Sequence, residues 1–432
     1  MTYVHSLKNT PAPERWGRVC QWMEEQPLPF YTELRRERPI LQLPGLVLVS
    51  RFDDCMAVLS QHERFTVALY KPKQAGYWMA EDETPRHWRE KGVMQAVLDR
   101  EDLPRLRAFA SERAAKCLDQ AGGRMDAVPE LSRAVPVALV QEMFGYDESN
   151  PAEIRAWSFW NQFDAFYNQP FHASTQRDPA PETITAQRQA ANQRMGAYLK
   201  GLLQRRAAQL AAQGGRGSEG ERGDPATRLL RLSQSGAVDF DIQRVARNVG
   251  GLLIGTIETT SQAVIHALSF LLSDPERREE AVEAAQSDEE TAIDGHVMEA
   301  LRFHPPFPYF FRVCEQDTLL GLGTASEQRI AAGTTVLTLN HSAMFDPSGF
   351  VDPHRFDPNR NQSLNFLFGH GHHACLGRHI GAAIIPAIVR QVLRRPGLQA
   401  AGPVDRAGGP FPEHFPLTWS DDRAPCGEPA AT

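Results

Sequence analysis

The sequence lacks the features that would mark a secreted, membrane-spanning or nucleic-acid-binding protein. Its six cysteines are scattered and include no CxxC pair, so neither a disulfide framework nor a four-cysteine cluster is indicated. No charge-free apolar run is long enough to cross a bilayer, and the N-terminus has no apolar signal core. The net charge of −7 provides no basic field for nucleic acid. We therefore expect a cytoplasmic protein with no membrane span and no nucleic-acid partner.

The composition that is present belongs to a globular protein with a sizeable core. Hydrophobic residues make up 42% of the chain and charged residues 23%. Helical periodicity dominates, but Leu41–Ser50 has the pattern of a hairpin with a Pro-Gly turn, and residues 307–360 are rich in strand formers and prolines. We expect one domain over residues 1–432, with flexible ends at residues 1–15 and 421–432.

The longest predicted helix covers Asp239–Ser273. Its centre is apolar on nearly every face, which is typical of a helix buried on all sides. Further helices are expected at residues 275–286 and 291–303, and one more directly after Cys375. Gly214–Asp224 is rich in glycine and charge, and we expect a surface loop there.

The segment Phe368–Gly377, with the sequence FGHGHHACLG, contains one cysteine and three glycines. Glycines let a backbone approach a large flat ligand closely. Cys375 also precedes a predicted helix, where the helix dipole and free N–H groups stabilise a thiolate. A cysteine thiolate that binds haem iron favours cleavage of the O–O bond.

Two other interpretations of Cys375 are open from the spacing alone. A lone cysteine is most often a buried structural residue. Zinc is the other alternative, because four histidines crowd the same segment: His370, His372, His373 and His379. Zinc sites have recognisable ligand spacings, and the adjacent His372 and His373 would point in different directions in most backbone conformations.

The segment resembles the haem-binding loop of the cytochromes P450 at every defining position, namely Phe368, Gly369, Gly371, His373, Cys375 and Gly377. The resemblance implies a mainly α fold with small β-sheets, in which a long central I helix lies over a buried haem b. It further implies that Cys375 binds the iron and that Phe368, Gly369 and Gly377 contact the cofactor.

A Glu–Arg pair upstream agrees with this resemblance. Glu299 and Arg302 are three residues apart and share a helix face, which by itself is typical of a surface salt bridge. In the cytochromes P450 such a pair lies near the core and is joined by an arginine of the following meander. The segment Asp352–Asp357 resembles that meander, so the resemblance implies that Arg355 is the third member.

The long apolar helix carries an acid and several hydroxyls at its centre. Burying Glu258, Thr259 and Thr260 without partners would cost several kcal/mol, so these residues need a partner or a function. Threonine can also bond back to the carbonyl four residues earlier and bend the helix. The resemblance implies that Thr259 holds water or protons near the iron-bound oxygen and that Glu258 relays protons. Thr256 departs from the family pattern, which often has glycine there.

Three basic residues are implied as ligands of the haem carboxylates. Arg312 and His370 correspond by resemblance to propionate-binding residues, and an arginine–carboxylate pair is strong. Arg107 is the arginine of a His-x-x-x-Arg pattern in the family's C helix. The histidine position of that pattern is Leu103 here, so the propionate anchor departs from the family.

The resemblance implies a monooxygenase that inserts one oxygen atom of O2 into a lipophilic or aromatic small molecule. Aromatic residues are frequent in the segments that face substrate in the family, such as Phe307–Phe311 and residues 157–171. The chain has no flavin or iron–sulfur domain, so NAD(P)H would act indirectly, through a ferredoxin-type electron donor and its reductase. A basic patch for that donor is expected at Arg105, Arg107, Arg113, Lys116 and Arg378.

Two alternative functions are compatible with a haem site. The first is a haem-thiolate enzyme driven by peroxide, or one that isomerises its substrate; such members often lack the acid–threonine pair, which is present here at Glu258 and Thr259. The second is a haem-binding sensor or carrier protein, in which the buried acid and hydroxyls would serve no purpose.

Overall fold

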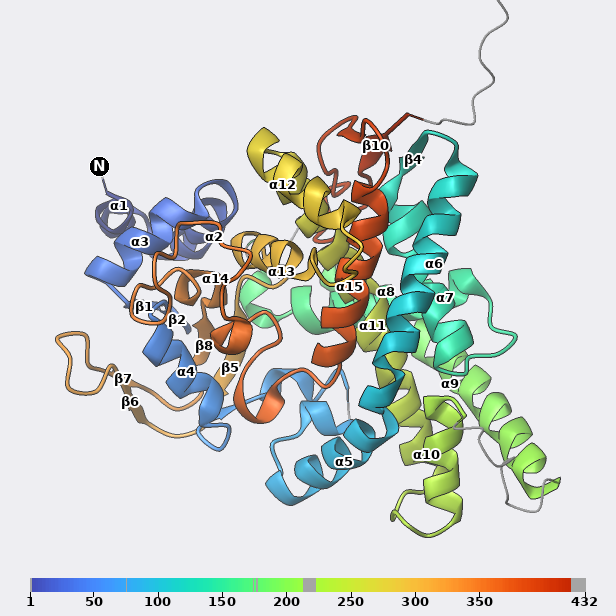
Figure 1. The fold of residues 1–432 in the computed structure, drawn as a ribbon. Helices are drawn as coiled ribbons and strands as arrows, with labels where there is room; N and C mark the ends of the chain where they lie inside the picture. Colours follow the sequence, from blue (N-terminus) through green and yellow to red (C-terminus); the bar gives the residue numbers. More distant parts are fainter. Residues whose placement is uncertain (1, 75, 174, 176–177, 213–222, 421–432) are drawn as a thin grey trace, which may run out of the picture.

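The computed structural model describes residues 2–74, 76–173, 175, 178–212 and 223–420, and it is mainly helical (Figure 1). The helices before the central one are α1 Tyr3–Asn9, α2 Arg15–Glu25, α3 Pro27–Glu37, α4 Phe52–Ser60, α5 Thr84–Val97, α6 Leu103–Ala121, α7 Ala134–Met143, α8 Pro151–Gln162, α9 Pro181–Ala212 and α10 Pro225–Gln234. The central and later ones are α11 Ile242–Leu272, α12 Pro275–Gln286, α13 Asp294–Phe303, α14 Asn340–Ala343 and α15 Arg378–Leu393.

The strands form three small sheets, as the expected fold class requires. The largest has the strand order β1-β2-β8-β5-β3, with β1 Ile40–Leu43, β2 Leu46–Val49, β3 Phe65–Thr66, β5 Phe310–Cys314 and β8 Thr335–Thr338. The predicted hairpin is confirmed, because β1 and β2 pair antiparallel around a turn in which Gly45 has a φ of 71°. The other two sheets contain β4 Arg124–Asp126, β9 Gln399–Ala400 and β10 Pro416–Thr418, and β6 Thr318–Leu320 with β7 Gln328–Ile330.

The predicted apolar helix is confirmed as α11, which crosses the centre of the molecule (Figure 1). It begins after Asp241, whose carboxylate accepts a hydrogen bond from the Arg244 N–H at 2.7 Å and so caps the first turn. Its side chains belong to one core with those of α6, α7, α13 and α15. The 31 residues of α11 make it one residue shorter than α9, which has 32, so α11 is not the longest helix.

The Cys375 segment lies between the large sheet and α15. Helix α15 packs beside α6, and its inner face of Ile384, Ile388 and Val392 is buried (Figure 1). Pro386 lies inside this helix and is buried. Because α15 starts directly after Gly377, the fold fixes the cysteine at the end of a rigid helix.

The N-terminal segment is ordered differently from the expectation. Residues 2–15 were expected to be a flexible end, but they contain α1, whose Val4 and Leu7 are buried against the helices that follow. The Val4 N–H donates to the Glu33 carboxylate at 2.7 Å, which ties this helix to α3. The expectations for residues 421–432 and for most of Gly214–Asp224 fall outside the described residues.

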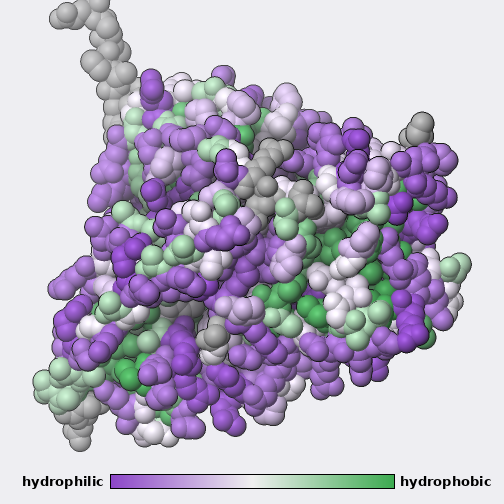
Figure 2. Space-filling view, turned by 180° about the vertical axis from the view of Figure 1, so that it is seen from behind, coloured by the Kyte–Doolittle hydropathy of each residue, from purple (hydrophilic) through white to green (hydrophobic). Residues whose placement is uncertain are grey.

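The lengths and apolarity of the helices bear on the expected absence of a membrane span. Among the described residues, no helix is both long and apolar enough to cross a bilayer. The face opposite to that of Figure 1 is mostly hydrophilic, with hydrophobic side chains visible only in separate, smaller areas (Figure 2).

Candidate active site

A cavity of about 600 Å³ lies between α11 and the Cys375 segment. This volume is in the range of small-molecule sites in proteins. The α11 wall consists of Ala246, Arg247, Gly250, Gly251, Leu252, Ile254, Gly255, Thr256, Thr259, Thr260 and Ala263. The opposite side and the rim include Leu301, Phe307, Phe310, Arg312, Phe368, Gly369, His373, Cys375, Gly377, Ile380, Gly381 and Ile384.

The Cys375 side chain opens onto this cavity, where a metal-bound ligand could reach it. The Cys375 N–H donates to the Phe368 carbonyl at 2.8 Å, which closes the segment into a tight loop. Gly371 makes the loop possible, because it has a φ of 69° and a Cβ there would lie 2.5 Å from the Leu59 carbonyl. Burial raises the pKa of the Cys375 thiol, while the Gly377 N–H and the charges of Lys91 and Arg378 oppose this shift.

Thr259 faces the cavity from α11, as the sequence predicts. Its hydroxyl donates to the Gly255 carbonyl at 2.6 Å, and the Thr256 hydroxyl donates to the Leu252 carbonyl at 2.6 Å. Both bonds follow the expected pattern of threonine bonding to the carbonyl four residues earlier. The helix continues through this region as an α-helix. Thr256 and Thr259 therefore present a pair of hydroxyls on the same face, three residues apart.

Glu258 is fully buried and lies on a different side of α11 from Thr259. It is not among the cavity-lining residues, and its side chain points about 100° around the helix from that of Thr259, toward Arg133. Its Oε2 lies 3.1 Å from the Arg133 guanidinium, which also binds the Glu413 carboxylate at 2.7 and 2.9 Å. Burial raises the pKa of Glu258, and Arg133 opposes the rise. The second oxygen, Oε1, has no hydrogen-bond partner in the described part of the chain.

The cavity rim fits the carboxylates of a haem. Arg312 lines the cavity and is buried; its guanidinium donates to the Phe311 carbonyl at 2.8 Å, and no carboxylate of the described residues lies within 4.0 Å of it. His373 also lines the cavity, and its Nε2 lies 3.1 Å from Asp82. A buried cation without an acidic partner needs an anion, which a haem carboxylate would supply. The cysteine, the glycines and this rim together fit a haem.

Two of the predicted carboxylate ligands lie elsewhere. Arg107 pairs with Asp294 at 2.7 and 2.9 Å and does not line the cavity, so the prediction that it binds a haem carboxylate is wrong for this structure. His370 does not line the cavity either, and its ring contacts Phe366. Because the loop turns at Gly369 and Gly371, His373 faces the cavity in its place.

Two basic residues that sequence reasoning missed hold the Cys375 loop from α5. The His87 ring binds the His372 carbonyl at 2.9 Å, and Lys91 Nζ donates to the carbonyls of His372 at 2.6 Å and Ala374 at 3.0 Å. These residues are four apart, so they lie on one helix face. His87 and Lys91 have the spacing of the His-x-x-x-Arg pattern sought at Leu103, with lysine in place of arginine. That spacing was the feature of the sequence from which this pair could have been identified.

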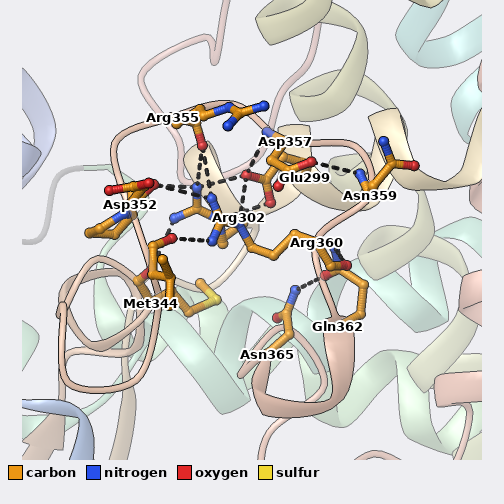
Figure 3. Close-up of polar contacts among 12 residues, drawn as sticks. Glu299, Arg302, Met344, Asp352, Arg355, Asp357, Asn359, Arg360, Gln362 and Asn365 are labelled. Carbon is orange, nitrogen blue, oxygen red and sulfur yellow. Dashed lines mark hydrogen bonds and ion pairs between the residues drawn. The ribbon is translucent and has the colours of Figure 1, made fainter.

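The Glu299–Arg302 pair is buried and bidentate, with bonds of 2.8 and 2.9 Å (Figure 3). Arg302 also donates to the carbonyls of Met344 at 2.9 Å and Pro353 at 2.8 Å. The third member is Arg360, whose Nε lies 3.1 Å from Glu299, and not Arg355 as predicted. Arg355 contributes only its carbonyl to this cluster (Figure 3).

Comparison with known proteins agrees with this site. The family model described as "Cytochrome P450" matches residues 20–400. The chain is 29% identical to the cytochrome P450 monooxygenase PikC of Streptomyces venezuelae, over 88% of this chain and 86% of that protein. It is 28% identical to the nocardicin C N-oxygenase of Nocardia uniformis subsp. tsuyamanensis, over 90% and 95%.

A solved structure shows the same fold. The open cytochrome P450 Eryk from S. erythraea superimposes with a TM-score of 0.73 and 22% identity, and covers 93% of this chain and 98% of its own. The mainly helical architecture with small sheets is thus that of the family. The match over residues 20–400 places this chain in the cytochrome P450 family, as a haem-thiolate monooxygenase.

Proposed function

We propose that this P450 inserts one oxygen atom of O2 into an unactivated C–H or double bond of a lipophilic small molecule, and that Cys375 would hold the iron of haem b. The observation that carries the proposal is that Cys375 and Thr259 line the same cavity. A haem bound at Cys375 would supply the O2-activating chemistry that a thiolate ligand favours. Arg312 and His373 would hold its carboxylates at the rim.

The lining of the cavity supports a lipophilic substrate. Of the aromatic residues considered from the sequence, Phe166, Phe307 and Phe310 line the cavity, together with Tyr77. Others are core residues, such as Trp157 and Phe163. The apolar wall excludes water and leaves recognition to shape and to a few polar groups.

Thr259 and Glu258 would divide the handling of protons between them. The Thr259 hydroxyl faces the cavity and can orient a water molecule there. Glu258 is one residue away, and its free Oε1 can take up or release a proton once the side chain turns from Arg133 toward the cavity. The Arg133–Glu413 pair leads from this buried acid to the partly exposed Glu413, which gives a polar path toward solvent.

Electrons would come from a separate ferredoxin-type protein with its own NAD(P)H-dependent reductase. The basic patch expected for its docking is partly neutralised, because Arg107 pairs with Asp294 and Arg113 lies 3.7 Å from Glu142. Lys116 and Arg378 are exposed and support docking on the cysteine side. The cytoplasmic location, where such donors occur, remains a prediction.

Replacing Thr259 by alanine should keep substrate binding and the thiolate spectrum but waste electrons as peroxide. The alanine removes the Thr259 hydroxyl from the cavity wall. Protons are then no longer delivered preferentially along the path that leads to product. We expect the product formed per NAD(P)H to fall about tenfold or more. Thr259→Ser keeps the hydroxyl and should restore most of the coupling. Equal coupling in wild type and Thr259→Ala would contradict the role.

Replacing Arg312 by glutamine should speed the loss of haem. A charge-assisted hydrogen bond contributes about 1.5–3 kcal/mol, which corresponds to roughly tenfold or more in the rate of haem transfer to an acceptor protein. Arg107→Gln is the matched control, because Arg107 pairs with Asp294 and lies outside the cavity wall. Faster haem loss from Arg107→Gln than from Arg312→Gln would reverse the assignment.

A further inference from the structure

The charged side chains of the cavity wall are all cationic. Lys73, Arg188, Arg247 and Arg312 line the cavity, and no aspartate or glutamate of the described residues does. Arg312 is at the rim near the cysteine, where the proposed function gives it a haem carboxylate. The other three lie on the loop before α5, on α9 and on α11, so they belong to the part of the cavity left for substrate.

Lys73 and Arg188 are held by one buried acid. Lys73 Nζ lies 3.2 Å from Asp164 Oδ1, and Arg188 Nε lies 2.8 Å from Asp164 Oδ2. Lys73 also donates to the Asp164 carbonyl at 2.7 Å. Two cations thus share one carboxylate, and their geometry is fixed by the contacts that join the loop to α9. The net charge of these three side chains is positive, but Lys73 and Arg188 are both already paired with Asp164.

Arg247 is different, because no carboxylate of the described residues lies within the 4.0 Å of an ion pair with it. It is exposed at the N-terminal part of α11, and its guanidinium lies against Gly76, where a Cβ would be 3.2 Å from Nη1. Its neighbour Arg244, one turn earlier, is by contrast paired with Glu90 at 2.8 Å. Arg247 therefore offers an uncompensated cation to the cavity.

Arg247 and Thr259 lie on the same cavity-facing side of α11, joined by Gly251 and Gly255. Twelve residues separate them, so they are about 18 Å apart along the helix axis. The Tyr77 side chain lies directly over Gly251, where a Cβ would be 2.4 Å from its hydroxyl, so Tyr77 narrows the cavity between the two ends. The wall between the two ends is mostly apolar, with Ile254 and Phe310 among its members.

We propose that the substrate is a lipophilic carboxylic acid whose carboxylate binds Arg247, while the remote end of its apolar body lies near Thr259 and Cys375. This substrate class rests on the proposed monooxygenase function. A carboxylate matches the guanidinium in charge and in bidentate geometry, and the absence of lining acids in the described chain removes any repulsion. Oxidation is then expected at a carbon far from the carboxylate, because α11 holds Arg247 and Thr259 at opposite ends of the site.

The test compares straight-chain fatty acids of increasing length with their methyl esters, as ligands of the haem-loaded protein. Binding is followed by the spectral shift of the haem and by calorimetry. We expect each acid to bind wild type at least tenfold more tightly than its ester, with affinity falling as salt is added. Arg247→Gln should weaken the acids by about tenfold and leave the esters unchanged. Arg278→Gln, an exposed arginine of α12 outside the cavity wall, is the control and should change neither.

Equal affinity of the wild type for acid and ester would overturn this substrate class. An equal loss of affinity for acid and ester in Arg247→Gln would overturn it as well. The ferrous–CO spectrum of the same samples reports on the proposed function separately. A normal thiolate spectrum without any preference for acids therefore rejects the carboxylate site alone.

Discussion

Replacing Cys375 by serine should abolish the thiolate-type Soret shift of the ferrous–CO complex and reduce monooxygenation to background. Cys375 is the only described cysteine that lines the cavity, so no other thiolate can take its place there. A serine hydroxyl is not ionised near neutral pH and does not push electron density toward the iron as a thiolate does. The measurement is the CO difference spectrum of protein with a verified haem content.

Cys117→Ser is the matched control for this change. Cys117 lies on α6, is partly buried and is not part of the cavity wall, so the variant should keep both spectrum and activity. The His373 ring also lines the cavity, and haem held through an imidazole would give a different spectrum. A thiolate spectrum that persists in Cys375→Ser would mean that another cysteine binds the iron.

Short sequence patterns predicted the helices, turns and loops whose residues are consecutive in the chain. The apolar stretch around Leu253 predicted α11, because the residues that make a buried helix are consecutive in the sequence. The Pro-Gly turn predicted the β1–β2 hairpin for the same reason. The position of Cys375 on the cavity wall also follows from a short segment, since its glycines and the start of α15 are consecutive in sequence.

The errors concern contacts between distant segments. Arg107 meets Asp294 across 187 positions of the chain, and Lys91 meets the Cys375 loop across more than 280. The i, i+4 spacing of His87 and Lys91 could have drawn attention to this pair, but it does not show which distant segment the pair contacts. The choice between Arg355 and Arg360 depends on how the meander folds back over Glu299. Likewise, the choice of His373 over His370 depends on the positive φ of Gly369 and Gly371, which the sequence allows but does not require.

The position of Glu258 shows what helical geometry could and could not provide. Adjacent residues point about 100° apart around a helix, but this alone does not decide which of them face the cavity, because the adjacent Thr259 and Thr260 both line it. The partner of Glu258, Arg133, comes from a segment 125 residues earlier and was not predictable from spacing. The acid is therefore held away from the cavity by an ion pair that only the tertiary structure defines.

Replacing Arg302 by alanine should prevent the accumulation of folded, haem-containing protein. Glu299 and Arg302 are both completely buried, and removal of Arg302 takes the bidentate partner from Glu299, which keeps only the contacts at 3.1 Å from Arg360 and the Asp357 N–H. It also removes the donor to the carbonyls of Met344 and Pro353. Breaking such a pair costs about 3–5 kcal/mol, which is a large part of the roughly 5–15 kcal/mol that stabilises a typical protein. Arg302→Lys should fail almost as badly, because an ammonium cannot reproduce the bidentate guanidinium contacts.

The two arginines of the meander provide graded controls for this expectation. Arg360→Ala removes the contact to Glu299 at 3.1 Å and three hydrogen bonds to backbone carbonyls, those of Val351 at 2.7 Å, Arg355 at 3.0 Å and Asp352 at 3.2 Å. It should therefore lower the thermal unfolding midpoint of the purified protein measurably while still allowing haem binding. Arg355→Ala leaves its carbonyl in place and should behave like wild type. If Arg355→Ala were the more damaging of the two, the assignment of Arg360 as the third member of the cluster in Figure 3 would be overturned in favour of Arg355.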